Sequence, residues 1–136
     1  MKAIADTGFL VAFANRRDLH HKWAIEIASH LTEPLLTCEA VLAESAFHLG
    51  SVPLVMEFMS TGLVRLAFNL AEHVAEIEAL AGRYLDRHPD LADLCLIRMS
   101  ELHPRHKVVT TDLADFSVYR RHRHDPIPLI HPPKPT

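Results

Sequence analysis

The segment Lys2-Ala3-Ile4-Ala5-Asp6-Thr7-Gly8 stands at the start of the chain and leads into the apolar run Phe9-Leu10-Val11-Ala12-Phe13-Ala14. We interpret it as a buried strand that ends on Asp6, a turn at Thr7-Gly8 and a helix over 9–14. A later segment, Lys107-Val108-Val109-Thr110-Thr111-Asp112, is rich in β-branched residues and predicts another strand that ends on an aspartate.

The segments between and after these two alternate in type. Apolar periodicity, caps and breakers predict helices over 18–31, 39–49, 53–60, 71–86 and 90–102, and strands over 35–38, 63–68 and 127–130. Strands separated by helices on a short chain imply right-handed crossovers and a parallel sheet covered on both faces. We therefore expect a three-layer α/β/α fold with a mostly parallel, four- to five-stranded sheet. Residues 1–131 should form a single domain, followed by a frayed, proline-rich tail at 132–136.

Composition narrows the class of protein. The 136 residues are 49% hydrophobic and 23% charged, which suffices for one core and excludes a disordered or collagen-like chain. No apolar run approaches the roughly 20 residues that a membrane-spanning helix needs, so no membrane association is expected. Because Asp6 precedes any signal-type apolar run, we expect a cytoplasmic protein. Cys38 and Cys95 lie in apolar segments without metal-site spacing and are predicted to be buried thiols.

Charge is distributed unevenly along the chain. The formal net charge is −3, yet residues 103–136 hold six Lys or Arg against three Asp or Glu. The densest cationic stretch is Arg120-Arg121-His122-Arg123-His124, whose guanidiniums and imidazoles are suited to phosphate oxygens. A solvated loop that keeps the protein soluble is the alternative reading of this stretch.

The two strand-end aspartates predict a binding site. Ligands of open parallel sheets bind beyond the carboxyl ends of the strands, so Asp6 and Asp112 converge if their strands are neighbours. Thr7, Thr110 and Thr111 would then supply hydroxyl groups beside them. Taken singly, each aspartate could instead be a turn or helix cap.

Two further acids are candidates for the same site. Glu44 lies in the apolar stretch Ala40–Phe47, where an ionised carboxylate needs a metal or a basic partner, His48 being one possibility. Asp93 lies in the first turn of the helix that Asp90 is expected to cap, so a capping or dipole role competes with ligation.

Four carboxylates at one edge favour a hard divalent cation. Without one, each would raise the pKa of the others. Oxygen ligands suit Mg²⁺ or Mn²⁺, and no Cys/His set has the spacing of a zinc site. Such a centre activates water and stabilises charge in phosphodiester displacement.

These motifs resemble those of the PIN domain family, and in particular its single-domain VapC-type ribonuclease toxins. The resemblance rests on Ile4–Ala12, Glu44, Pro89-Asp90-Leu91-Ala92-Asp93 and Thr110–Phe116, in that order. It implies a catalytic, metal-binding quartet of Asp6, Glu44, Asp93 and Asp112, with Thr7, Asp90, Thr111 and Asp115 as auxiliary residues. Because Asp90 stands three residues before Asp93, either can be the ligand from that motif.

The resemblance also implies an activity and partners. It predicts Mg²⁺- or Mn²⁺-dependent endonucleolytic cleavage of RNA, a homodimer, and a small cognate antitoxin that covers the active site. RNA binding would fall to five arginines, namely Arg16, Arg17, Arg120, Arg121 and Arg123. The helices at 9–14 and 53–59 are the expected dimer surfaces.

Two other functions compete with this hypothesis. A catalytically silent PIN-like module would use the acids to bind RNA or a basic protein. A phosphohydrolase of the receiver or haloacid-dehalogenase kind is disfavoured, because Asp6 has no second acid nearby in sequence and Lys107 precedes its strand.

Overall fold

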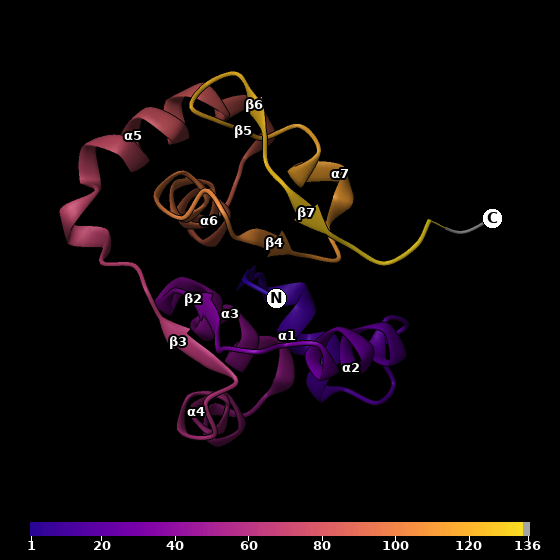
Figure 1. Cartoon of the computed structure of the whole chain (residues 1–136). Helices are drawn as coiled ribbons and strands as arrows, with labels where there is room; N and C mark the ends of the chain where they lie inside the picture. The colour runs from indigo at the N-terminus through magenta and orange to yellow at the C-terminus, as the bar shows by residue number, and fades with distance from the viewer. Residues whose placement is uncertain (135–136) are drawn as a thin grey trace.

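A computed structural model of the chain describes residues 1–134 (Figure 1). Its central sheet has five parallel strands in the order β3-β2-β1-β4-β7. The strands are β1 (Ala3–Ala5), β2 (Leu35–Thr37), β3 (Val64–Leu66), β4 (Lys107–Val109) and β7 (Leu129–Ile130). Helices flank this sheet, and the predicted three-layer α/β/α class is confirmed. In the register, Ile4 of β1 lies between Leu36 of β2 and Val108 of β4.

Seven α-helices connect and cover the strands in the described residues. They are α1 (Thr7–Ala14), α2 (His21–Ser29), α3 (Glu39–Leu49), α4 (Val52–Ser60), α5 (Val74–Arg83), α6 (Leu91–Leu102) and α7 (Leu113–Phe116). Short 3₁₀ turns, η1 (Leu70–Glu72) and η2 (Leu85–Arg87), flank α5. Gly50 ends α3 in the left-handed conformation at φ 65°, which glycine adopts at no steric cost. None of these helices has the length and apolar character that a bilayer crossing requires.

The core lies between the sheet and its helices. Ile4, Leu35 and Val108 of the strands and Leu10 and Leu96 of the helices are completely buried. Burial of such side chains is the main favourable contribution to folding, at about 1.5–3 kcal/mol each. Cys38 and Cys95 are free and buried, as predicted.

Three helical segments before residue 90 differ in detail from the sequence prediction. Thr7 and Gly8 form the first turn of α1 and not a separate turn, because the Asp6 side chain caps the helix by accepting from the Thr7 backbone N–H. The helix predicted over 18–31 spans only His21–Ser29. The segment predicted as one helix over 71–86 is divided into η1, α5 and η2.

The C-terminal part differs more. Strand β4 ends at Val109, so Asp112 is not a strand residue; its side chain caps α7 by accepting from the Asp115 N–H. Helix α7 and the antiparallel hairpin of β5 (Arg120–Arg121) and β6 (Asp125–Pro126) were not predicted. The hairpin turn places His122 and Arg123 at φ 50° and 70°, where glycine or asparagine is the usual sequence signal. Of the predicted tail, 132–134 form no helix or strand, and 135–136 lie outside the described residues.

Candidate active site

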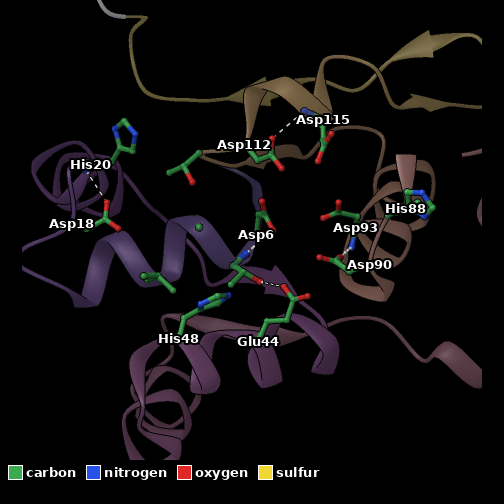
Figure 2. Close-up of a pocket in the computed structure, with 15 residues that line it drawn as sticks. Asp6, Asp18, His20, Glu44, His48, His88, Asp90, Asp93, Asp112 and Asp115 are labelled. Carbon is green, nitrogen blue, oxygen red and sulfur yellow. Dashed lines mark hydrogen bonds between the residues drawn. The ribbon is translucent and has the colours of Figure 1, made fainter. Parts of the chain in front are cut away.

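A cavity of about 500 Å³ opens beyond the carboxyl ends of β1 and β4 (Figure 2). It gathers acids from segments far apart in the sequence, together with three histidines, His20, His48 and His88. The acids that line it are Asp6, Asp18, Glu44, Asp90, Asp93, Asp112 and Asp115. All four acids of the predicted quartet therefore face one space, as do the auxiliary residues Thr7, Asp90, Thr111 and Asp115.

Asp6 is the most buried acid of the cavity. Its Oδ1 accepts from the Thr7 N–H at 2.7 Å, and its Oδ2 accepts from Thr110 Oγ1 at 2.6 Å. Burial raises the pKa of Asp6 to about 6, although both hydrogen bonds favour the ionised form. The Thr110 hydroxyl also accepts from the Asp112 N–H at 2.9 Å, so one threonine connects the two predicted ligands.

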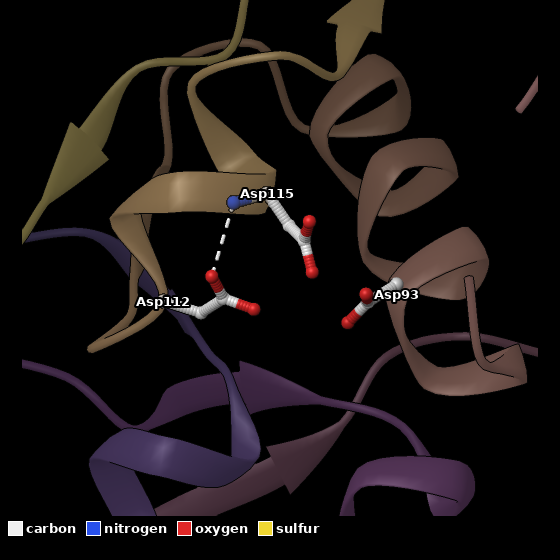
Figure 3. Close-up of side chains that lie close together, drawn as sticks. All are labelled: Asp93, Asp112 and Asp115. Atoms are coloured by element: carbon white, nitrogen blue, oxygen red, sulfur yellow. Dashed lines mark hydrogen bonds between the residues drawn. The ribbon is translucent and has the colours of Figure 1, made fainter. Parts of the chain in front are cut away.

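Three other carboxylates form a compact cluster. Asp93, Asp112 and Asp115 each place one oxygen within 4.8 Å of the others (Figure 3). One oxygen of each carboxylate is bonded to the protein: Tyr119 Oη donates to Asp93 Oδ2 at 2.9 Å, and the Asp115 N–H donates to Asp112 Oδ1 at 3.0 Å. Arg87 Nη2 donates to Asp115 Oδ1 at 2.8 Å. Within the described residues, one oxygen of each carboxylate has no protein donor.

The electrostatics of this cluster favour a cation. Burial, followed by the charge of Asp90, raises the pKa of Asp93 to about 8, and the Tyr119 hydrogen bond opposes this shift. Burial and the neighbouring Asp115 raise the pKa of Asp112. A divalent ion would neutralise the repulsion and favour the ionised forms of Asp93 and Asp112. The donor set, which consists of carboxylate oxygens, fits Mg²⁺ or Mn²⁺.

Glu44 reaches the cavity from α3 but is outside the three-acid cluster. Its Oε2 accepts from Thr7 Oγ1 at 2.9 Å. Burial raises the pKa of Glu44, and the charge of Asp90 adds to the effect. Among the described residues Glu44 has no hydrogen bond or ion pair with His48, so Thr7, which sequence reasoning did not pair with it, is its polar partner.

The family of the chain follows from comparison with known proteins. The PIN domain matches residues 3–121, from β1 to the end of β5. The chain belongs to the PIN domain family. PIN domains are generally metal-dependent nucleases, and the acid-lined cavity of this PIN domain fits that chemistry. No curated protein matches the sequence.

Gly8 brings two parts of this PIN domain into close contact. A Cβ added to Gly8 would clash with Thr111 Oγ1 and would lie 3.3 Å from Thr111 Cβ. The start of α1 is therefore packed directly against the loop between Thr110 and Asp112. The absence of a side chain at position 8 permits this close approach. Backbone conformation is not the reason for glycine here, since Gly8 lies in α1 and has no positive φ.

Two side-chain contacts of the cavity acids were not predicted from the sequence. Tyr119, completely buried, holds Asp93, and Arg87 pairs with Asp115 at the rim. Neither residue lies in a motif of the acids, and their partners are 26 and 28 positions away. The cluster also includes Asp115, which was predicted as auxiliary, whereas Asp6 and Glu44 flank it.

The five predicted RNA-binding arginines differ in their exposure and in their contacts with the protein. Arg16, Arg17 and Arg123 are exposed. Arg120 Nη1 donates to the carbonyls of Ser117 and Tyr119, and Arg121 Nη1 donates to those of Ser100 and Pro104. These bonds attach the β5–β6 hairpin to the rest of the PIN domain, and a role of the five arginines in RNA binding stays a prediction.

Proposed function

We propose that this PIN domain is a Mg²⁺- or Mn²⁺-dependent endoribonuclease, the cytoplasmic toxin of a toxin–antitoxin pair. The observation that carries the proposal is the approach of Asp93, Asp112 and Asp115 within 4.8 Å in a cavity lined by acids. The pKa values of Asp93 and Asp112 are raised. Carboxylates this close together favour the binding of a cation that neutralises their mutual repulsion. The family supplies the reaction class, namely hydrolysis of a phosphodiester bond.

Each acid has a distinct role in this proposal. Asp93 and Asp112 hold the cation together with Asp6, and Asp115 completes the cluster. Glu44, fixed by its hydrogen bond from Thr7, completes the shell or orients the attacking water. A bound Mg²⁺ would supply a water of lowered pKa and stabilise charge on the attacking and leaving oxygens. No nucleophilic side chain is needed, and no covalent intermediate forms.

The proposed homodimer and antitoxin need exposed apolar surface. Helix α1, one of the expected dimer surfaces, is instead part of the core, because Phe9, Leu10 and Ala12 are completely buried. Helix α4 keeps Val52 and Met56 62% and 47% exposed, with Phe47 of α3 82% exposed. We therefore assign the proposed dimer contact to α4 and the end of α3.

A catalytically silent binding module is the second candidate. The Arg87–Asp115 ion pair favours it, because a guanidinium already neutralises part of the cluster. In that case the acids would bind a basic partner and no metal would be required.

Asp112→Asn tests the proposed function. Asparagine retains the cap of α7, so folding should persist while a metal-ligand charge is lost. We expect Mg²⁺-dependent cleavage of a mixed single-stranded RNA to fall to background in a gel assay, and calorimetric Mn²⁺ binding to weaken. Asp125→Asn, on exposed β6 outside the cavity, is the matched control and should cleave normally. Undiminished cleavage by Asp112→Asn would refute the assignment, and a wild-type chain that binds no Mn²⁺ would favour the silent module.

A further inference from the structure

We propose that Tyr119 is a positioning residue of the metal centre, and that its phenol orients the Asp93 carboxylate toward Asp112 and Asp115. The inference rests on the proposed function, because it concerns the same cation site. Nothing in the sequence motifs of the acids includes Tyr119, which follows α7 by three positions.

The first support is the contact itself. Tyr119 Oη donates to Asp93 Oδ2 at 2.9 Å, and the Tyr119 side chain is completely buried. A buried phenol without a partner loses the hydrogen bonds it had in water, so this hydroxyl is committed to Asp93. Oδ2 of Asp93 is bonded to the phenol, whereas Oδ1 has no protein donor among the described residues and can meet a cation without competition.

The second support is the rigidity of the phenol. The Tyr119 ring packs edge-on against Phe116 at a centroid distance of 5.2 Å and against Tyr84 at 5.0 Å. Its backbone N–H donates to the Asp115 carbonyl at 3.1 Å. Tyr119 therefore connects Asp93 of α6 with Asp115 of α7.

The third support is that the same arrangement recurs in the cluster. Asp112 and Asp115 each also have one oxygen bonded to a protein donor, the Asp115 N–H and Arg87. Fixing one oxygen of a carboxylate sets the direction of the other before a cation arrives. Such outer partners of metal ligands typically contribute 10- to 100-fold to metal affinity.

A purely structural role would require only the ring. The aromatic contacts with Phe116 and Tyr84 are available to phenylalanine, whereas the bond to Asp93 is not. Tyr84 offers a matched control, since its hydroxyl accepts from the Arg120 N–H in the same aromatic cluster and touches no acid of the cavity.

The experiment compares Tyr119→Phe with Tyr84→Phe in the full chain. Calorimetric titration should show Mn²⁺ affinity weakened about tenfold or more by Tyr119→Phe and unchanged by Tyr84→Phe. RNA cleavage by Tyr119→Phe should recover at high Mn²⁺ with an unaltered KM for RNA, which a misfolded core would not do. Equal Mn²⁺ affinity in wild type and Tyr119→Phe would overturn the positioning role and leave the proposed function standing. A wild-type chain without Mn²⁺ binding would instead refute the proposed function.

A second measurement uses the wild-type chain and does not depend on the stability of a variant. The chain has two tyrosines, so labelling with ¹³C at Cζ gives two signals, assigned with Tyr84→Phe. Addition of diamagnetic Mg²⁺ should shift the Tyr119 signal and leave the Tyr84 signal in place. If Mg²⁺ binds and the Tyr119 signal does not move, the inference is wrong.

Discussion

At the scale of single residues, the carboxyls of Asp6 and Asp93 hold their protons at pH values where an exposed aspartate is ionised. Burial is the main cause in both, and it raises the pKa of Asp6 to about 6 and that of Asp93 to about 8 from 3.8. In the unfolded chain both groups return to ordinary values. Their contribution to stability is therefore fully present below pH 3.8 and is lost as the pH rises through 6 and 8.

The metal-free protein should thus become less stable as the pH rises from 3.8, the ordinary pKa of both groups, to about 8, the raised pKa of Asp93. Thermal unfolding in EDTA measures the change, and Asp93→Asn should flatten the profile because asparagine does not titrate. Mn²⁺ should raise the melting temperature more at pH 8 than at pH 6, since ligation requires ionised carboxylates. Parallel profiles for wild type and Asp93→Asn would contradict the assignment of the effect to Asp93.

Asp6→Asn should separate stability from function. The rise in the pKa of Asp6 from 3.8 to about 6 lowers the unfolding free energy of the wild-type protein by at most about 3 kcal/mol at pH 8. A neutral amide at position 6 avoids this loss. The amide oxygen of the introduced asparagine can accept from the Thr7 N–H, as the Asp6 carboxylate does, and keep the cap of α1. We expect unfolding free energy in urea at pH 8 to equal or exceed that of wild type, while Mg²⁺-dependent RNA cleavage is lost. A variant that is both less stable and still active would refute the role of Asp6.

At the scale of elements, Asp90 is a helix-capping aspartate in the same sequence motif as the proposed metal ligand Asp93. Its Oδ1 accepts from the Asp93 N–H at 2.9 Å and caps α6, while its charge raises the pKa of Asp93. Asp90→Ser retains a capping oxygen and removes the charge, whereas Asp90→Ala removes both.

We expect Asp90→Ala to lower the unfolding free energy by about 1 kcal/mol and Asp90→Ser to lower it less. Both variants should weaken Mn²⁺ binding far less than Asp93→Asn, because Asp90 lies outside the three-acid cluster. Denaturant titration and calorimetry measure the two effects. If Asp90→Ser abolished Mn²⁺ binding, Asp90 and not Asp93 would be the principal ligand of this motif.

The elements that could be predicted from sequence are those with a strong local signal. Short apolar or β-branched runs predicted the five parallel strands, and Gly50 predicted the end of α3. Helix α7 has only Leu113–Phe116, too short for a periodic pattern. The β5–β6 hairpin turns at His122 and Arg123 without the glycine or asparagine that usually mark such a turn.

At the scale of the whole molecule, the gathering of the acids followed from topology. Because β1 and β4 pair directly and in parallel, Asp6 and Asp112 had to emerge at the same edge. The contacts that orient them could not be predicted in this way. Tyr119 and Arg87 reach Asp93 and Asp115 through tertiary packing, and no spacing rule connects such pairs.

The net negative charge of the whole molecule opposes RNA binding. Any affinity for RNA must therefore come from cations near the site. The net charge is −3, and the cavity is lined by acids. Arg16 and Arg17 are exposed directly after α1, in the loop that leads to Asp18 and His20 at the cavity. We therefore predict that their guanidiniums bind phosphates of an RNA that enters the site.

Replacing both Arg16 and Arg17 by alanine should weaken RNA binding and its dependence on salt. Loss of two phosphate contacts would lower the slope of log affinity against log salt by about 1.4 for single-stranded RNA. Fluorescence anisotropy at several salt concentrations, in the Asp112→Asn background with Mg²⁺, measures this without cleavage. Arg65→Ala, which removes an exposed cation of β3 away from the cavity lining, is the control and should leave the slope unchanged. An equal loss per removed charge in the two variants would mean that RNA senses only the overall charge, and the loop after α1 would then have no specific part in recognition.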